Sequence, residues 1–151
     1  MQVGEVMTPD VRTCAIDRTF ADAASVLHDN RISSVVIVDD AGGVAGIVTE
    51  RDLVNVVADG LDPAATVLSG HMTTDLTTVD PRDDIADAAA TMAEHGIRHL
   101  PVLSGGKLAG ILSIRDLWRW ALDELTAGHE LPDLERAHHA LSAAVQVHHK
   151  R

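Results

Sequence analysis

The chain has 151 residues, 46% of them hydrophobic and 23% charged, with 12 Lys and Arg against 23 Asp and Glu and a formal charge of −11. This length suits one ordinary core or two small units that pack together. The surplus of acids argues against nucleic acid, whose phosphates are bound by clustered Lys and Arg. The sequence has no apolar run long enough to span a bilayer, and residues 1–5 do not have the basic and apolar regions typical of a signal peptide. We therefore expect a cytoplasmic protein with no membrane contact.

Two stretches of the chain repeat each other. At an offset of 65, Met7-Thr8 aligns with Met72-Thr73, and residues 21–24 align with the identical residues 86–89. Further on the offset is 64, because the turn at residues 39–43 is one residue shorter in the second copy. Hairpin loops tolerate such changes in length, so the position of the deletion supports the alignment. We predict repeat 1 over residues 1–61, repeat 2 over residues 62–125 and a C-terminal helical tail over residues 126–151.

Each repeat is predicted to contain, in chain order, a short strand, a helix, a β-hairpin and a second helix. The first strands fall near residues 13–16 and 77–79. The following helices carry apolar stripes at helical spacing, which we expect to face a common core: Phe20, Ala23, Ala24 and Leu27, then Ile85, Ala88, Ala89 and Met92. Thr19 and Asp84 are predicted N-caps, each with an Asp three residues on that would complete a capping box. Gly96 is predicted to end the second of these helices.

The hairpins are predicted at residues 35–48 and 100–112, where nearly continuous apolar runs indicate strands buried on both faces. The sequence therefore predicts an α/β (α+β) fold. It is a tandem pair with pseudo-twofold symmetry, in which two small sheets are each flanked by helices.

The tail has an apolar stripe that would suit either a docked helix or a solvated helical face: Leu131, Leu134, Ala137, Leu141, Ala144 and Val145. Trp118 and Trp120 cannot share one helical face, so we expect one in the core and the other on a partner or dimer surface. The single cysteine, Cys14, is expected to be a small buried residue. His95 and His99 are not expected to share a face, and we predict no metal site.

The two hairpins end in the same motif, a hydroxyl residue followed three positions later by an acid. Thr49 and Asp52 form it in repeat 1, and Ser113 and Asp116 form it in repeat 2. One interpretation is a capping box that opens a helix. The other is a ribose site, because an ionised Asp offers two acceptor oxygens to vicinal hydroxyls. The same residues satisfy both interpretations.

Two copies of this pattern, each opening with Met-Thr and closing with Gly-h-h-(Ser/Thr)-x-x-Asp, resemble a pair of cystathionine-β-synthase (CBS) domains, a Bateman module. The resemblance covers residues 3 to 125 and implies clefts between the repeats that bind adenosine nucleotides. It assigns ribose binding to Asp52 and Asp116, with Thr49 and Ser113 beside a phosphate. Adenine would lie along the first strands, among residues 13–16 and 77–79, which include Ile16 and Val79.

Phosphate binding needs positive charge, and the resemblance assigns it to a basic pair, Arg98 and His99, before the central strand of repeat 2. His99 is suited to report pH as well. Repeat 1 has Ser33 and Ser34 at the aligned positions. We therefore expect unequal binding by the two repeats, with one strong site at most. Arg51 and Arg115 are candidates to compensate for the missing cation.

The sequence thus predicts a regulatory module that binds AMP, ADP, ATP, S-adenosylmethionine or NAD between its repeats and signals to a protein partner in trans, as a homodimer. The alternative is a homodimeric scaffold that binds no ligand and uses the motifs only as helix caps. No nucleophile–base pair, Walker-type loop or paired carboxylates are present in the sequence, so we expect no enzyme activity and no cofactor apart from the regulatory ligand.

Overall fold

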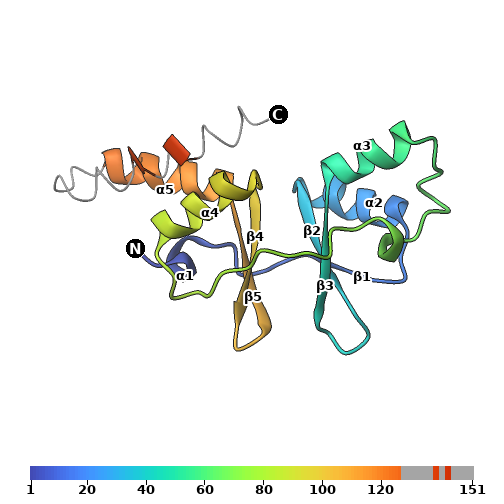
Figure 1. Cartoon of the computed structure of the whole chain (residues 1–151), viewed down its shortest axis with the longest axis horizontal. Helices are drawn as coiled ribbons and strands as arrows, with labels where there is room; N and C mark the ends of the chain where they lie inside the picture. Colours follow the sequence, from blue (N-terminus) through green and yellow to red (C-terminus); the bar gives the residue numbers. More distant parts are fainter. Residues whose placement is uncertain (127–137, 140–141, 144–151) are drawn as a thin grey trace. The chain divides into compact units, whose positions relative to one another are not determined.

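The computed structural model describes residues 1–126, 138–139 and 142–143, which form two compact units (Figure 1). Unit 1 consists of Met1–Pro9 and the described residues from Thr77 onward, and unit 2 consists of Asp10–Leu76. The predicted tail stripe of Leu131, Leu134, Ala137, Leu141, Ala144 and Val145 lies outside the described residues.

Unit 2 contains a three-stranded sheet in the order β1-β2-β3. In chain order its elements are β1 (Thr13–Ala15), α2 (Phe20–Asn30), β2 (Ser34–Val38), β3 (Val44–Thr49), α3 (Glu50–Ala58) and the 3-10 turn η1 (Leu68–Gly70). β1 runs parallel to β2, and β2 and β3 form the predicted antiparallel hairpin. β2 is almost wholly buried, as its continuous apolar sequence predicts.

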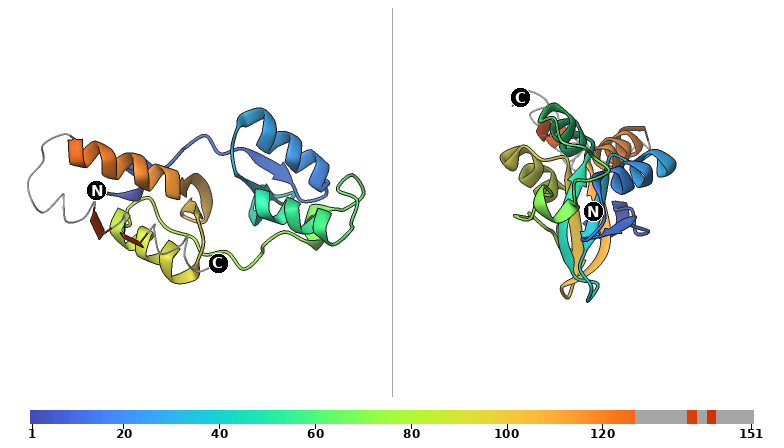
Figure 2. Two further views of the ribbon diagram at one scale, coloured as in Figure 1. Left: turned by 90° about the horizontal axis from the view of Figure 1, so that it is seen from above. Right: turned by 90° about the vertical axis from the view of Figure 1, so that its right-hand side faces the viewer.

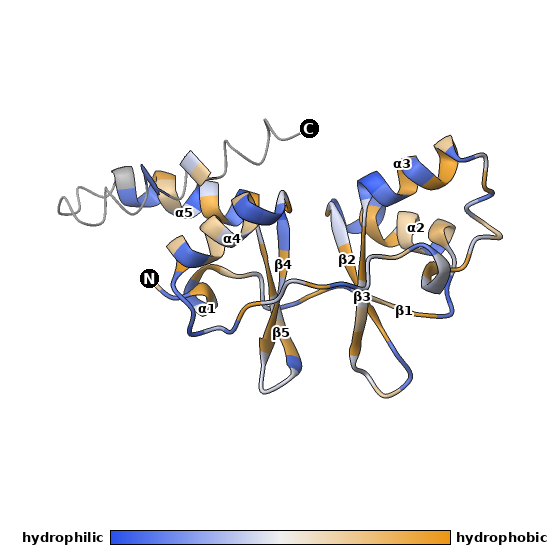
Figure 3. Cartoon of the chain, viewed as in Figure 1, coloured by the Kyte–Doolittle hydropathy of each residue, from blue (hydrophilic) through white to orange (hydrophobic). Residues whose placement is uncertain are grey.

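Unit 1 is built around the second hairpin, whose strands are coloured hydrophobic over most of their length in Figure 3. Its elements are α1 (Val3–Val6), α4 (Ile85–His95), β4 (His99–Ser104), β5 (Lys107–Ser113) and α5 (Ile114–Thr126). The strand expected near residues 77–79 is reduced to a single parallel bridge between Val79 and Val102. In unit 2 the ladder continues because the Ile16 N–H donates to Val38 O at 3.0 Å. The aligned residue in unit 1 is Pro81, which has no N–H to donate.

Each unit has its own apolar core, so the expectation of one common core is wrong. Phe20, Ala23 and Leu27 of α2 are buried in the core of unit 2, and the stripe of α4 is buried in the core of unit 1. Each helix packs on the hairpin of its own unit, which is the nearest apolar surface. Both units therefore have the predicted mixed architecture, a small sheet flanked by helices.

The opening segments of the two repeats are exchanged between the units. Val3, from the start of repeat 1, is fully buried in the core of unit 1, where its N–H donates to Asp83 O at 2.9 Å. Leu68, from the start of repeat 2, is fully buried in the core of unit 2, and its N–H donates to Arg18 O at 2.8 Å. The compact units therefore differ from the sequence repeats in their opening segments.

The exchanged segments explain two glycines of the closing motif. A Cβ atom on Gly46 would lie 2.8 Å from both Met72 Sδ and Thr73 O. At the aligned position, a Cβ on Gly110 would overlap the Met7 side chain and lie 3.0 Å from Thr8 O. Only glycine allows the Met-Thr segment to approach the strand this closely.

The helix termini largely follow the predicted caps. The Thr19 N–H donates to Asp22 Oδ2 at 3.0 Å, and the Asp22 N–H donates to Thr19 Oγ1 at 3.3 Å. Asp84 instead accepts the Ala86 N–H at 2.9 Å, so the predicted capping box with Asp87 is not formed. Gly96 ends α4 with a φ of 65°, as expected. Among the described residues, no helix combines the length and hydropathy needed to cross a membrane.

Candidate functional site

In unit 2, Thr49 and Asp52 lie where β3 ends and α3 begins. Asp52 Oδ2 accepts the Thr49 N–H at 2.7 Å and the Thr49 hydroxyl at 2.8 Å. The hydrogen bonds satisfy a main-chain donor that would otherwise be unpaired at the start of the helix. The predicted capping box is confirmed, and it fixes the position of the carboxylate beside the hydroxyl.

In unit 1, Ser113 and Asp116 repeat this geometry at the start of α5. Asp116 Oδ2 accepts the Ser113 N–H at 2.8 Å and the Ser113 hydroxyl at 2.6 Å. Asp116 is only 6% exposed, whereas Asp52 is half-buried. The duplicated motif therefore holds two carboxylates in the same local geometry but with unequal access to solvent.

The caps use only one oxygen of each carboxylate. Asp52 Oδ1 has no hydrogen-bond partner among the described residues. Asp116 Oδ1 lies 3.7 Å from Nη1 of Arg119, whose side chain is 73% exposed, and an ion pair this exposed to water is weak. Arg119 was not predicted as a site residue, although its position three residues after Asp116 on one helical face could have indicated it. Each carboxylate thus keeps an acceptor that the helix does not need.

The basic pair and the closing motif of repeat 2 are neighbours in unit 1. His99 opens β4 and pairs directly with Ser113 at the end of β5, and the Ile114 N–H donates to Arg98 O at 3.0 Å. Unit 2 has the same register, with Ser34 opposite Thr49. The strand register therefore agrees with the sequence alignment, and Arg98 and His99 of unit 1 stand where unit 2 has Ser33 and Ser34.

The environment of His99 contradicts the expectation that it reports pH. Its pKa is lowered to about 4, mainly by burial and further by the charges of Arg98 and Arg115, against the opposing effect of Asp116. His99 is therefore neutral at physiological pH. Arg51 and Arg115, the candidates to compensate for the missing cation, are both exposed.

The first strand of unit 2, which the CBS resemblance associates with adenine, borders a cavity of about 390 Å³. Arg12 and Ile16 exchange main-chain hydrogen bonds with β2, so the alternate residue Thr13 directs its N–H and C=O groups to the open edge of β1. At the end of the strand, the Ala15 C=O instead accepts the Arg18 N–H at 3.1 Å. The cavity is lined by Thr13, Cys14, Ala15, Arg18, Asp22, Ser25 and Val26. Such an edge offers main-chain donors and acceptors of the kind that can pair with a base.

The two predicted apolar contacts from the first strands lie at different positions in their units. Ile16 follows β1, packs against the core of unit 2 and does not line this cavity. Val79 packs against the core of unit 1, and its aligned residue in unit 2 is Cys14. Cys14 is 8% exposed, and burial, with a contribution from Asp22, raises the pKa of its thiol. It is therefore a protonated core side chain, as expected.

A second cavity, of about 410 Å³, lies within unit 1 and includes Asp116. Its other lining residues come from the N-terminal segment and α5: Met1, Glu5, Val6, Arg119, Trp120 and Asp123. Among the described residues, no group of three or more His, Cys, Asp or Glu side chains is arranged to hold a metal ion. His95 lies at the end of α4 with Nδ1 3.0 Å from Thr91 O.

The duplicated fold and motif can now be compared with known proteins. The model of the CBS domain matches residues 3–59 and 66–117. The chain belongs to the CBS-domain family. This CBS pair is 31% identical over 133 residues to the CBS domain-containing protein YhcV of Bacillus subtilis, a match that covers 87% of this chain and 94% of YhcV.

Solved structures agree with this assignment. A putative signal-transduction protein with CBS domains from Burkholderia ambifaria is 31% identical, with a TM-score of 0.76, over 87% of this chain and 98% of that one. A CBS domain protein from Pyrobaculum aerophilum, solved in complex with AMP, is 26% identical, with a TM-score of 0.75, over 91% of this chain and 98% of that one. The tandem CBS fold is thereby confirmed, and adenosine-ligand binding is a property of proteins similar to this chain.

Proposed function

We propose that this CBS pair is a non-catalytic regulatory module that binds an adenosine-containing ligand and signals to a protein partner in trans. The observation that carries the proposal is the uncommitted Oδ1 of Asp52, held beside the Thr49 hydroxyl by a cap that uses only Oδ2. A ribose presents two neighbouring hydroxyls that can donate to such a carboxylate. The AMP complex of the similar P. aerophilum protein supports this choice of ligand class.

The proposed phosphate chemistry belongs to the repeat 2 residues. Arg98, whose main-chain O accepts the N–H of Ile114 directly after Ser113, supplies a planar, always charged donor group, whereas unit 2 has serines at the aligned positions. We therefore expect one phosphate-binding site per chain, centred on Arg98, His99 and Ser113. AMP, ADP and ATP are the first candidates, followed by S-adenosylmethionine and NAD.

The alternative function is a homodimeric scaffold that binds no ligand, and the occupied Oδ2 atoms favour it, because both motifs do act as caps. Asp→Asn substitutions separate the two functions. An asparagine retains one carbonyl oxygen for the cap but replaces the second acceptor with an N–H donor, which cannot accept from a ribose hydroxyl. Asp→Ala removes both oxygens and should cost about 1 kcal/mol in cap stability.

The test is a thermal-unfolding panel of the wild-type chain, Asp52→Asn and Asp116→Asn against AMP, ADP, ATP, S-adenosylmethionine and NADH. A ligand at a hundredfold its Kd should stabilise the fold by about 2.7 kcal/mol, a shift of several degrees in Tm. We expect at least one ligand to shift the wild type, and at least one Asn variant to lose that shift while its ligand-free Tm stays near wild type. A wild type that no ligand shifts would leave the scaffold as the better account.

A further inference from the structure

Trp120 of α5 has a buried indole N–H for which the described part of the chain offers no acceptor. Its side chain is 7% exposed, and Nε1 is withdrawn from solvent without a hydrogen-bond partner among the described residues. An indole N–H can only donate, and a buried donor that lacks an acceptor costs free energy. Trp120 also lines the cavity of about 410 Å³ in unit 1. A molecule that brings an acceptor into this cavity can therefore satisfy the N–H.

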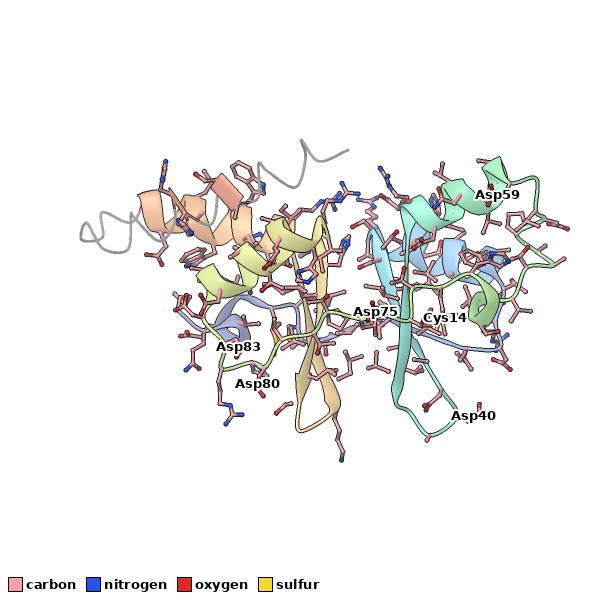
Figure 4. The ribbon with its side chains drawn as sticks, viewed as in Figure 1. Cys14, Asp40, Asp59, Asp75, Asp80 and Asp83 are labelled. Atoms are coloured by element: carbon pink, nitrogen blue, oxygen red, sulfur yellow. The ribbon has the colours of Figure 1, made fainter. Side chains whose placement is uncertain are left out.

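Unit 2 shows that the fold does not need this N–H. Val56 aligns with Trp120 and is 2% exposed in the core of unit 2, so an aliphatic side chain is sufficient to fill the buried position. The acid three residues further on is common to both units, because Asp59, labelled in Figure 4, aligns with Asp123. The indole N–H therefore distinguishes unit 1 at this position.

Acidic side chains line the same cavity from two segments of the chain. Asp116, Trp120 and Asp123 follow the i, i+4, i+7 spacing of one face of α5, and the helix cap uses only Oδ2 of Asp116. Glu5 belongs to α1, which packs on α5, and Figure 2 shows the N-terminus beside that helix. Glu5 Oε2 accepts the Gln2 N–H at 2.7 Å, whereas Oε1 has no hydrogen-bond partner among the described residues. The cavity thus has carboxylate oxygens that the main chain does not use.

The charged side chains of the cavity have both signs. Arg119 supplies the positive charge, with Nη1 3.7 Å from Asp116 Oδ1. A simple amine would pair with the acids but would bring no acceptor for the indole N–H, and an inorganic anion would meet three acids. An α-amino acid satisfies both kinds of group, because its carboxylate accepts from N–H donors and its ammonium donates to carboxylates.

The apolar part of the lining limits the side chain of such a ligand. Met1, Val6 and the ring of Trp120 are its apolar groups, and they favour an apolar side chain. The volume of about 410 Å³ falls in the range of small-molecule sites, about 300–1,000 Å³. Leucine, isoleucine, valine and methionine are therefore the first candidates.

We propose that this cavity of unit 1 is a second ligand site, which binds a free α-amino acid with an apolar side chain. The ligand carboxylate accepts from Trp120 Nε1 and Arg119, and the ligand ammonium donates to Asp116 Oδ1 and Glu5 Oε1. The amino acid is a second input to the regulatory module. The proposed adenosine site uses neither Trp120 nor Glu5, so either proposal can fail alone.

The first test uses the fluorescence of Trp120. The chain has two tryptophans and no tyrosine, so Trp118→Phe, at a position 37% exposed and outside the cavity lining, leaves Trp120 as the sole indole. This full-length variant is titrated with the four amino acids, and with isopentylamine and 4-methylpentanoate, which each lack one charged group of leucine. S-adenosylmethionine, which carries both charged groups on an adenosine, completes the panel. We expect a saturable change in emission with at least one amino acid, and binding at least about tenfold weaker for the amine and the acid.

The second test compares variants by calorimetric titration of the amino acid that binds most tightly. Trp120→Phe removes the N–H but keeps an aromatic ring. Glu5→Gln removes the charge at an exposed position but keeps a carbonyl oxygen for the Gln2 N–H. Each should raise the Kd of the amino acid about tenfold or more, whereas Trp118→Phe should leave it unchanged. All three variants should bind AMP as the wild type does.

Several results would overturn the proposal. They are an emission that no free amino acid changes, a matching amine that binds as tightly as the amino acid, and an unchanged Kd in Glu5→Gln. A response to S-adenosylmethionine alone would also overturn it, because the cavity would then take no free amino acid. If an amino acid binds but AMP does not, the adenosine proposal alone fails.

Discussion

The two units of this CBS pair fold from repeated sequence, yet their candidate ligand residues are arranged differently. Unit 2 has an accessible Asp52 with one free carboxylate oxygen, an open strand edge along a cavity and no cation before its central strand. Unit 1 has the basic pair beside Ser113 but a nearly buried Asp116, and its first strand is a single bridge. The comparison shows that duplication preserves the capped motif, while substitutions at aligned positions change the charge and the strand edge around it.

The largest expected effect is a loss of stability when an opening segment of a repeat is truncated, and it tests which unit each segment belongs to. Leu68→Ala should destabilise the fold by about 2–5 kcal/mol, because it leaves a cavity in the core of unit 2. Val3→Ala, a smaller truncation in the core of unit 1, should cost less.

Amide hydrogen exchange distinguishes the two variants. Leu68→Ala should accelerate exchange mainly in α2 and β2, and Val3→Ala mainly in α4 and β4, although Val3 belongs to repeat 1 in sequence. If Val3→Ala instead accelerated amide hydrogen exchange in unit 2, the assignment of the opening segment of repeat 1 to unit 1 would be wrong.

The next effect concerns His99, which has a serine as its counterpart in unit 2. Its pKa is lowered from about 6.5 to about 4, so the unfolded chain binds a proton that the folded chain does not. The contribution of His99 to the free energy of unfolding is therefore fully present above about pH 6.5. It falls as the pH drops toward 4, by about 3 kcal/mol at most.

Urea unfolding at pH 7.5 and pH 5 measures this loss. His99→Gln keeps a neutral polar side chain and should reduce the pH dependence, whereas His28→Gln, at an exposed position of α2, should not. Equal pH dependence in the wild type and His99→Gln would show that His99 is not the group responsible.

Local sequence signals predicted much of this structure. The stripes of α2 and α4, the Thr19 cap and the two closing motifs depend on neighbours within one turn of helix, and the hairpins depend on continuous apolar runs. The sequence did not predict that the opening segments with Val3 and Leu68 lie in the opposite units, because their contacts are with residues far away in the sequence. The helix α1 is also too short to show periodicity.

Other features depended on the environment that the fold creates. The lowered pKa of His99 results from burial between charged neighbours, which the isolated motif does not show. The strand before Pro81 is reduced because Pro81 has no N–H, whereas the aligned Ile16 donates one to Val38 O. The sequence alone does not show that this donor extends the ladder.

The central claim, an adenosine sensor with unequal repeats, is tested most directly by calorimetric titration of AMP into the wild type, Arg98→Gln and Ser33→Arg. Ser33→Arg places in repeat 1 the cation that repeat 2 has at Arg98. We predict one tight AMP site per chain in the wild type and an affinity at least about tenfold lower in Arg98→Gln. In Ser33→Arg, we predict a second AMP site, in repeat 1, that binds more tightly than repeat 1 does in the wild type. Two equal sites in the wild type, or an unchanged Kd in Arg98→Gln, would contradict the account.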